Sequence, residues 1–363
     1  MTTTGIDTAR RDALTERLFE ATLGALELHS VHLGWRLGLY RVLADSGPLT
    51  SAELASRAGI DERYAREWLE QQAVAGFLDV AHVAEDGSKR QYALSAEHAE
   101  VLAEPECSAY VAPFAPMLVG IAAAMPSVVE AYRSGEGVPY PLYGTDFRDG
   151  QGAINRPAYV HELAGWLAAI PGLHERLASS DNPARVADLG CGQGWSTQAL
   201  AAAYPHATVE GHDADEASVL DARGYVDDRD MTSRVSFAVG DASGLTARAY
   251  DLVCIFEALH DMAQPVAVLA DVRRALQPSG CVLVADERVA DSFTAPGDQV
   301  ERMMYGWSVS HCLPASRAEQ PSAALGTVLR ASTVVELSAA AGFASCDVLP
   351  IDNDFFRFYL FRP

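Results

Sequence analysis

The sequence predicts an α/β fold in which a mainly parallel sheet, covered by helices, follows an N-terminal domain that is mainly α-helical. From Arg185 onward, short runs rich in β-branched residues alternate with helical segments, which is typical of a parallel sheet with helices on both faces. Before residue 105, apolar residues recur mostly at helical spacing. We therefore expect strands at residues 186–189, 207–211, 235–239, 252–256 and 281–285.

The first hundred residues predict helices with clear start and stop signals. Residues 13–43 carry apolar side chains at helical spacing, so a long helix is expected there. Thr50 followed by Glu53 fits a capping box, in which each residue satisfies a backbone amide of the other. That box opens a short helix, and Gly59 is suited to end it.

A second short helix and a hairpin follow. Asp61 can cap a helix that runs to Gly76, and residues 77–80 and 91–94 flank Asp86-Gly87, which is a turn signal. Three side chains of this helix are expected to face inward: Tyr64, Trp68 and Leu69. Helix, tight turn, helix and hairpin is the order of a winged helix.

Two interpretations of this winged helix compete. One is DNA recognition, and the other is a dimerisation and substrate-lid module. A recognition helix needs cations for phosphates and donors for bases. Residues 61–70 hold four acids against two arginines, which favours the interpretation without DNA.

The first long helix carries two apolar stripes that point in different directions. A helix that is apolar on two faces needs two partners. Little of the chain precedes this helix to cover the second face, so we expect a twofold homodimer interface. One stripe holds Leu14, Leu18, Ala21, Ala25 and Leu28, and the other holds Phe19, Leu23 and Leu26.

Composition sets further bounds. The 363 residues suffice for two domains. We expect the helical domain at 1–105, a helical linker that contributes to the substrate pocket at 106–180, and the α/β domain at 181–363. A net charge of −22 disfavours nucleic acid as a partner. The six cysteines form no Cys-x-x-Cys pair, so we expect no metal and a reducing cytoplasm. Residues 117–125 are the richest apolar run and are too short to cross a membrane, and no signal peptide is evident.

A glycine-rich turn follows the first strand of the predicted sheet. Asp188 stands two positions before the run Gly190-Cys191-Gly192-Gln193-Gly194, and a helix begins directly afterwards. Glycines allow unusual dihedral angles and a close approach of a ligand to the backbone. A nicotinamide or flavin fold needs glycine at position 195, where this chain has Trp195.

Acids stand at the ends of the next two strands, and a histidine follows the fourth. Asp213 can accept hydrogen bonds from both ribose hydroxyls of an adenosine ligand. The third strand ends in Gly240-Asp241-Ala242, which can hold an adenine ring. His260 lies just beyond the fourth strand. Ligands of open α/β sheets gather at these carboxyl ends, so one site is expected.

In these features the chain resembles the Rossmann-like (class I) S-adenosylmethionine-dependent methyltransferases. The resemblance implies a mainly parallel seven-stranded sheet and S-adenosyl-L-methionine as the cofactor. It implies that Asp188 contacts the methionine end and that Asp213 holds the ribose. The other cofactor-binding residues that it implies are Gly190, Cys191 and Gly192 in the cradle, Gly240, Asp241 and Ala242 around the adenine, and Phe256 in the adenosine pocket.

With its winged helix, the whole chain resembles dimeric small-molecule O-methyltransferases, including actinobacterial proteins of this architecture. Leu259-His260-Asp261-Met262 looks like their His-Asp-Trp stretch, whose histidine is the general base. Met262 replaces the tryptophan, and the acids that flank the base in that family are not evident after Glu287. The resemblance implies His260 as the catalytic residue.

The long connection 289–331 is expected to form a lid over the substrate. Long ordered connections often bind ligands, and aromatic or methionine side chains suit a flat apolar acceptor. Packing against the N-terminal domain is the competing interpretation, and His311 is a second candidate base. The candidate substrate-binding residues are Met304, Tyr305, Trp307 and His311, with Tyr140 and Tyr143 from an upstream loop.

These patterns together predict methyl transfer from S-adenosylmethionine to a small, aromatic or polycyclic natural product, with oxygen favoured as the acceptor atom. The expected partners are this small molecule and a second copy of the chain, without nucleic acid or membrane. Two alternatives stay open: an enzyme of this fold that catalyses another reaction on a natural product, and a ligand-sensing winged-helix transcription regulator.

Overall fold

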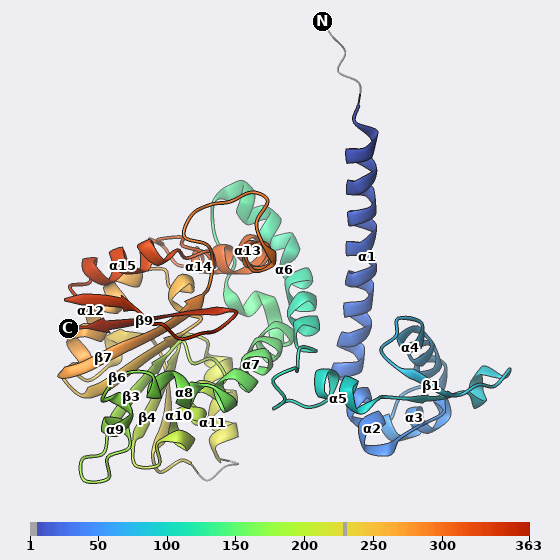
Figure 1. Ribbon diagram of the computed structural model, residues 1–363, viewed down its shortest axis with the longest axis horizontal. Helices are drawn as coiled ribbons and strands as arrows, with labels where there is room; N and C mark the ends of the chain where they lie inside the picture. The colour runs from blue at the N-terminus through green and yellow to red at the C-terminus, as the bar shows by residue number, and fades with distance from the viewer. Residues whose placement is uncertain (1–5, 228–230) are drawn as a thin grey trace, which may run out of the picture. The chain divides into compact units, whose positions relative to one another are not determined.

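The computed structural model describes residues 6–227 and 231–363, and the chain divides into two compact units (Figure 1). The N-terminal unit holds Met1–Val119 with Asp149–Ile154, and the C-terminal unit holds Gly120–Arg148 with Asn155–Pro363. Helices α6 (Phe114–Ser134) and α7 (Gly144–His161) contribute residues to both units. The three-part division expected from the sequence stays a prediction.

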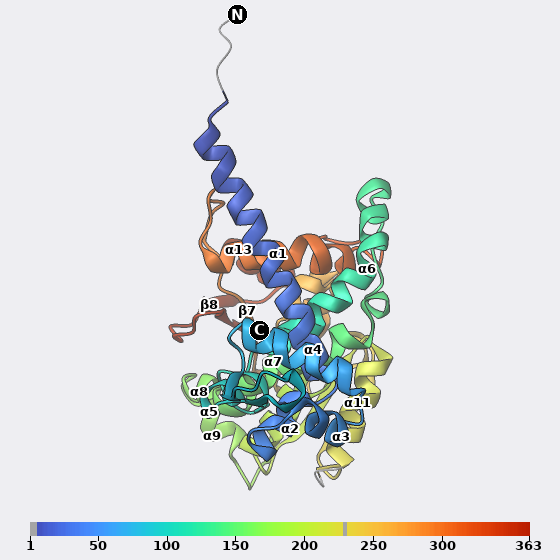
Figure 2. The same ribbon diagram turned by 90° about the vertical axis from the view of Figure 1, so that its right-hand side faces the viewer.

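The N-terminal unit begins with two helices where the sequence predicted one. Helix α1 (Thr8–Arg36) is a single long rod (Figure 2), and α2 (Leu39–Ser46) starts after a break. The prediction of a continuous helix over 13–43 is wrong because Gly38 adopts a left-handed conformation, with φ of 67°. Glycine takes this conformation without a steric penalty, so the chain turns there although the apolar spacing continues.

The next two helices begin as the sequence predicted. Thr50 and Glu53 form both bonds of the capping box before α3 (Ser51–Ala58), and Gly59 ends that helix. Asp61 accepts the backbone amides of Arg63 and Tyr64 at the start of α4 (Glu62–Val74). These local polar signals are sufficient to fix both helix starts.

The buried face of α4 differs in one residue from the prediction. Trp68 and Leu69 are buried, as expected. Tyr64 is 78% exposed, so its inward placement is wrong. The buried positions recur at 65, 68, 69 and 72, and residue 64 lies about a quarter turn from the centre of that face.

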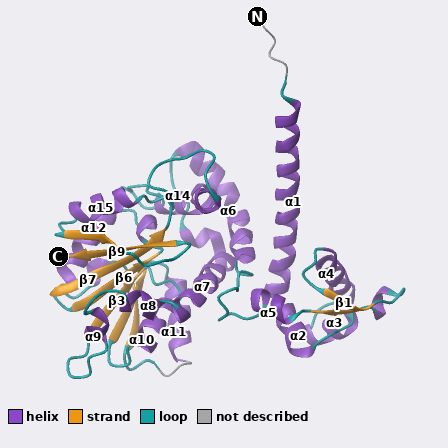
Figure 3. Ribbon diagram, viewed as in Figure 1, coloured by secondary structure: helices purple, strands orange, loops and turns teal. Residues whose placement is uncertain are grey.

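The predicted hairpin is present. Strands β1 (Asp79–His82) and β2 (Gln91–Ala93) pair antiparallel, with Asp79 opposite Ala93 (Figure 3). The short 3-10 helix η1 (Gly87–Lys89) lies between them, and α5 (Ala96–Leu102) follows. The order of a winged helix is therefore confirmed.

The C-terminal unit is built on a seven-stranded sheet in the order β5-β4-β3-β6-β7-β9-β8 (Figure 3). The first five strands in this order are parallel, and β9 pairs antiparallel with both β7 and β8. The predicted mainly parallel sheet is confirmed. The strands are β3 (Arg185–Leu189), β4 (Thr208–Asp213), β5 (Val235–Val239), β6 (Tyr250–Phe256), β7 (Leu276–Glu287), β8 (Ser345–Val348) and β9 (Phe356–Arg362).

Each face of this sheet has its own apolar core. Leu252 and Cys254 of β6 join one core, whereas Val253 and Ile255 join the other, as the period of two in a strand requires. The first core includes side chains of α8 (Leu163–Ala168), α10 (Trp195–Ala203) and α11 (Glu216–Asp227). The second includes side chains of α12 (Pro265–Ala275) and α15 (Ala331–Ala340). Coverage of both faces explains why the strands are almost continuously apolar.

Shorter helices complete the C-terminal unit. Helix α9 (Leu173–Leu177) precedes β3, and 3-10 helices follow several strands or loops. The connection after β7 folds into α13 (Gln299–Trp307), a π-helix η5 (Ser308–Cys312) and α14 (Leu313–Ser316). A π-helix is rare and occurs often at functional sites.

Helix α6 is long and apolar enough to span a membrane by length and composition. It exceeds the apolar run 117–125 that was predicted as too short, because the helix continues through residues 114–116 on one side and 126–134 on the other. Its side chains Ile121, Ala124 and Val128 are buried at a spacing of three and four residues. This pattern is that of a helix with one face packed in protein.

Candidate functional site

The candidate site lies at the carboxyl ends of four neighbouring strands, β5, β4, β3 and β6. Asp188 of β3 is opposite Gly211 of β4 and Cys254 of β6. Strands β4 and β5 lie on one side of β3, and β6 and β7 lie on its other side, so the order in which the chain adds strands reverses at β3. Ligands of open α/β sheets bind at such a reversal.

Asp188 is 1% exposed and makes strong hydrogen bonds on one side only. Its Oδ2 accepts the hydroxyls of Ser196 and Thr197, each at 2.6 Å. Its Oδ1 is buried and makes no hydrogen bond with any described residue. Burial raises the pKa of Asp188 to about 6, although the hydrogen bonds from the two hydroxyls lower it. The free oxygen is suited to accept a donor from a ligand.

The glycine loop packs closely against the end of β6. Gly190 has φ of 70°, and a Cβ added there would lie 2.4 Å from the Cβ of Ala258. Gly192 has φ of 50°, and nothing lies within 4 Å of its added Cβ. Burial raises the pKa of the Cys191 thiol well above its ordinary value, so this side chain is a small neutral residue of the loop.

Asp213 at the end of β4 is brought directly to the glycine loop. Its Oδ2 accepts the backbone amide of Gly192 at 2.7 Å, and its Oδ1 accepts that of Asp215 at 2.8 Å. Burial raises the pKa of Asp213. Each carboxylate oxygen has two lone pairs, so both can still accept hydroxyl donors.

Asp241 follows Gly240 at the end of β5 and is oriented by its own turn. Its Oδ1 accepts the amide of Ser243 at 2.9 Å and the hydroxyl at 2.6 Å. These bonds hold the pKa of Asp241 below its usual value. Ala242 is fully buried next to it, at the start of the 3-10 helix η3 (Ala242–Gly244). The sequence analysis did not identify Ser243.

Phe256 is placed in the core by the alternation of β6. Its ring lies 5.8 Å from that of Tyr159 and 6.1 Å from that of Trp166, measured between centroids. The same face carries Leu252 and Cys254. The assignment of Phe256 to an adenosine pocket stays a prediction.

His260 is 2% exposed in the 3-10 helix η4 (Leu259–Asp261), just beyond β6. Its Nδ1 lies 2.9 Å from Oδ1 of Asp286 and 3.3 Å from Oε2 of Glu287. Its Nε2 lies 3.5 Å from Oδ1 of Asp261. The two ring nitrogens therefore face different acids.

Asp286 and Glu287 are the flanking acids that the sequence analysis did not recognise. They end β7, which is the parallel neighbour of β6. No flanking acids were evident after Glu287 in the sequence, and the acids beside His260 come from the end of this strand itself. Two consecutive acids at the carboxyl end of an apolar strand were the signal that could have identified them.

The buried acids decide the protonation of this cluster. Burial lowers the pKa of His260, but the negative charges of Glu287, Asp286 and Asp261 raise it well above its ordinary value. Burial raises the pKa of Glu287 well above its ordinary range. Burial raises the pKa of Asp286, but the charge and hydrogen bond of His260 and the hydrogen bonds of Glu287 lower it overall, so Asp286 is the acid that pairs with His260.

Glu257 is a further acid that the sequence analysis did not identify. Its backbone φ is 51°, which is unusual for a residue other than glycine. Its Oε2 accepts the side-chain amide of Asn155 at 2.6 Å. Burial raises its pKa to about 7. A strained backbone and a half-buried acid with a raised pKa near His260 are typical of a functional site.

His311 lies in an aromatic cluster rather than beside an acid. Its ring stacks on Phe147 at 4.0 Å and meets the edge of Tyr143 at 4.5 Å and of Tyr140 at 5.8 Å. Burial, followed by the charge of His260, lowers the pKa of His311 to about 3. A neutral imidazole with so low a pKa is a poor general base near neutral pH.

The remaining predicted lid residues lie on α13. Met304 is buried, and Trp307 ends the helix directly before η5. The ring of Tyr305 meets the edge of Phe293 at 6.5 Å, and its hydroxyl lies 3.5 Å from Nη2 of Arg330. Tyr143 donates its hydroxyl to the carbonyl of Ser310 at 3.2 Å, which ties the 3-10 helix η2 (Tyr140–Tyr143) to η5.

Known proteins share both parts of this architecture. Residues 180–324 match the family described as "Methyltransferase domain", and residues 21–104 match the "Rv2258c-like winged HTH domain". Trans-aconitate 2-methyltransferase of Methylobacterium nodulans is 31% identical over 125 residues, which are 34% of this chain and 45% of that protein. Malonyl-[acyl-carrier protein] O-methyltransferase of Halalkalibacterium halodurans is 26% identical over 30% of this chain and 41% of its own. The chain spans less than half the length of these two curated relatives.

Solved structures resemble the whole chain. The mitomycin 7-O-methyltransferase MmcR superposes with a TM-score of 0.69 at 20% identity, covering 98% of this chain and 100% of its own. Human N-acetylserotonin methyltransferase, solved with S-adenosylmethionine, gives 0.70 at 17% identity, covering 100% and 99%. These likenesses confirm the fold that the glycine motif and the strand order indicated. Residues 180–324 therefore carry a methyltransferase domain with a Rossmann-like fold, and residues 21–104, which precede it in the chain, carry a winged-helix domain.

Proposed function

We propose that the protein transfers the methyl group of S-adenosylmethionine to a hydroxyl of a small aromatic or polycyclic natural product, with His260 as the general base. One observation carries the proposal. The ends of β3, β4 and β5 present the acids and glycines of a nucleoside site, and the next strand leads to a histidine held by two acids.

The cofactor residues follow from the site geometry. The unsatisfied Oδ1 of Asp188 would accept a donor of the methionine end, and Asp213 would accept the ribose hydroxyls. Asp241 and Ala242, set by Gly240, would hold the adenine. Gly190, Cys191 and Gly192 would form the cradle, because both glycines have positive φ and a Cβ at Gly190 would collide with Ala258.

The chemistry needs alignment and one proton acceptor. S-adenosylmethionine supplies a methyl group that its sulfonium already activates. Alignment of the acceptor and exclusion of water can lower the barrier by about 7–11 kcal/mol. In neutral His260 the Nδ1–H donates to Asp286, and Nε2 can accept the proton of the acceptor hydroxyl. Because the surrounding acids raise the pKa of His260, this neutral form gains population as the pH rises.

The charge around His260 limits the acceptor. Four carboxyl groups interact with it: Asp286 and Glu287 are buried, and Glu257 and Asp261 are half-buried. A polyanion such as trans-aconitate, the substrate in the name of one relative, would be repelled there. We infer a neutral or cationic acceptor, with Tyr143, His311 and the α13 residues Met304, Tyr305 and Trp307 lining its place.

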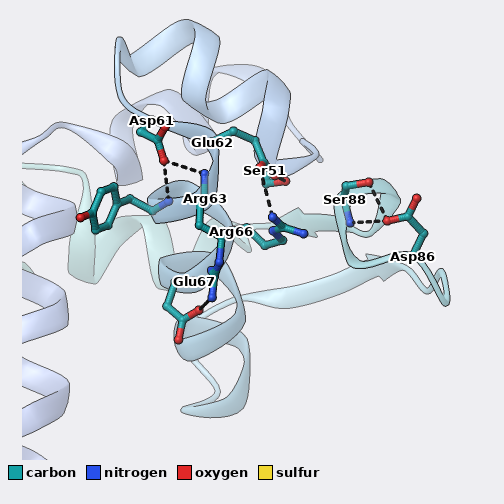
Figure 4. A network of polar contacts seen from close by, with 9 residues as sticks. Ser51, Asp61, Glu62, Arg63, Arg66, Glu67, Asp86 and Ser88 are labelled. Carbon is teal, nitrogen blue, oxygen red and sulfur yellow. Dashed lines mark hydrogen bonds and ion pairs between the residues drawn. The ribbon is translucent and has the colours of Figure 1, made fainter.

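The winged helix would serve assembly rather than DNA binding. In α4 the guanidinium of Arg63 pairs with Glu67, and that of Arg66 lies 3.3 Å from Glu62 (Figure 4). A phosphate would have to displace these acids. The match to a winged HTH domain nevertheless makes a ligand-sensing regulator the second candidate. DNA affinity at low salt distinguishes the two functions.

We also propose a homodimer in the cytoplasm. Both predicted apolar stripes of α1 lie largely exposed, with Leu18 at 60% and Phe19 at 63%. Helix α1 of a second copy is the partner of matching length and apolar character. The described cysteines are all free thiols, which suits a reducing compartment.

Substitution of Gly190 tests the cradle. Gly190→Ala should weaken binding of S-adenosylhomocysteine at least about tenfold, because the new methyl collides with Ala258 and a positive φ strains any side chain. Calorimetric titration measures this. Two control variants separate the backbone strain from the collision. Gly192→Ala has a positive φ but no collision, and the double variant Gly190→Ala with Ala258→Gly removes the collision. Wild-type affinity in Gly190→Ala would contradict the proposed cradle.

Asp188→Asn should stabilise the protein without cofactor. The folded pKa of Asp188 is about 6 against an ordinary 3.8, so ionisation costs folding stability as pH rises through that interval. At pH 7 the free energy of unfolding of the variant should exceed that of the wild type by up to about 3 kcal/mol. Below pH 3.8, where Asp188 is protonated in both the folded and the unfolded state, this difference should vanish. Urea unfolding at several pH values measures it. Asp241→Asn is the control of opposite sign, because the pKa of Asp241 is lowered.

His260→Ala should reduce kcat by about 10²–10⁴ and leave the affinity for S-adenosylhomocysteine nearly unchanged. Rates and calorimetry on the same preparations check this with one hydroxylated acceptor. His311→Ala is the comparison, because that imidazole lies among aromatic rings and away from acids. A large loss in His311→Ala with a small one in His260→Ala would move the base to His311.

Charge on α1 should dissociate the dimer. Leu18→Glu with Phe19→Glu places carboxylates on both exposed stripes, where burial of an unpaired charge is costly. Light scattering should change from twice the chain mass toward 38.8 kDa. Leu220→Glu on α11 is a control because this leucine is 67% exposed. A wild-type protein that stays at the monomer mass across concentrations would refute the dimer.

A further inference from the structure

We propose that Nε2 of His260, Oδ1 of Asp261 and Sγ of Cys312 form a binding site for a zinc-type divalent cation. The ligand atoms of these three residues lie within 4.8 Å of one another. His260 and Cys312 are buried, and the Asp261 side chain is 29% exposed. The three residues come from η4 and η5, so the fold brings them together across a long stretch of chain.

The spacing fits a tetrahedral ion. Zinc binds imidazole nitrogen and carboxylate oxygen at about 2.0–2.2 Å, which places two tetrahedral ligands roughly 3.4 Å apart. Nε2 of His260 and Oδ1 of Asp261 are 3.5 Å apart. This distance is long for a hydrogen bond and suits two ligands of one ion. Three protein ligands leave a fourth position open.

The opposite side of His260 is arranged as metal-bound histidines require. Its Nδ1 lies 2.9 Å from Oδ1 of Asp286. A histidine that binds a metal through one nitrogen almost always donates the other N–H to a carboxylate or carbonyl. Asp286 therefore fixes the ring so that Nε2 points its lone pair toward Asp261 and Cys312.

The carboxylate of Asp261 faces both other residues of the proposed site. Its buried Oδ1 lies 3.5 Å from Nε2 of His260, and the carboxylate accepts a hydrogen bond from the Cys312 thiol. Asp286 and Glu287 add negative charge on the far side of His260, so the region attracts a cation. Nitrogen, oxygen and thiolate donors together favour zinc or cobalt over magnesium.

Cys312 distinguishes this site from an ordinary buried thiol. Most free buried cysteines are small packing residues. Cys312 instead ends the π-helix η5, where the irregular turn places it beside His260 and Asp261, and Nδ1 of the neighbouring His311 lies 3.4 Å from its sulfur. Binding of the ion would release the thiol proton.

An ion at this site would occupy the lone pair that the proposed function gives to the acceptor proton. Bound zinc and base catalysis by His260 would therefore exclude each other, and zinc would inhibit methyl transfer. The binding itself does not rest on the proposed function, whereas the inhibition does.

Cobalt provides the direct test. Metal-free protein titrated with Co²⁺ should bind one equivalent and develop the absorption of a cobalt–thiolate bond, and Zn²⁺ should displace it. Cys312→Ser should lose the thiolate absorption and at least about tenfold in affinity, and Asp261→Asn should lose affinity while it keeps the absorption. Cys346→Ser is the matched control, because Cys346 lies apart on β8. Circular dichroism confirms that each variant is folded.

The outcomes separate this proposal from the proposed function. Weak binding of many equivalents, or equal affinity in Cys312→Ser and wild type, would overturn the site. A cobalt spectrum without a thiolate band would do the same. Stoichiometric binding through Cys312 that leaves methyl transfer uninhibited would support the site and would contradict His260 as the base.

Discussion

The parallel pairing of β3 with β4 on one side and β6 on the other is the constraint on which the site depends. This pairing puts Asp188 level with Gly211 and Cys254, so the chain after all three strands emerges at one edge. The amides of Gly190 and Cys191 both donate to the carbonyl of His212, which joins the glycine loop to the end of β4. A slip in either pair would separate Asp213 from the loop and turn alternate side chains to the other face.

The same edge concentrates buried acid in a protein that is already strongly acidic. Asp188, Glu257 and Glu287 all have pKa values raised by burial, so the fold bears the cost of carboxyl groups that water would otherwise stabilise. Only some of that cost is offset, by Ser196 and Thr197 at one acid and by Asn155 at another. Sites that bind charged ligands commonly retain such groups at the expense of stability.

The sequence predicted those features that depend on neighbouring residues. Thr50 and Asp61 act on amides two or three residues away, and the glycine motif and Asp213 have fixed places relative to their strands. The mainly parallel seven-stranded sheet also followed, because the resemblance implied it. Gly38 shows the limit of periodicity, since one glycine broke a helix whose apolar pattern continued.

The missed residues depend on contacts between distant segments. Asp286 reaches His260 only because β7 is the neighbour of β6, and Asn155 reaches Glu257 across about a hundred residues of chain. Nothing in the residues around Asn155 or Cys312 indicates these contacts. The sequence shows Asp286 directly after the predicted strand 281–285, but it does not show that His260 is its partner.

The two nitrogens of His260 give the cluster its chemical character. One nitrogen is fixed by Asp286, and this fixation determines which lone pair is available at the other. A strand end thus sets the direction in which a loop residue can accept a proton or a cation. Burial keeps the competing water away from Nε2, so what occupies that position depends on charge and shape. Because acids surround the ring, a neutral hydroxyl or a cation is favoured there over a carboxylate, and the acceptor must compete with whichever cation the same acids attract.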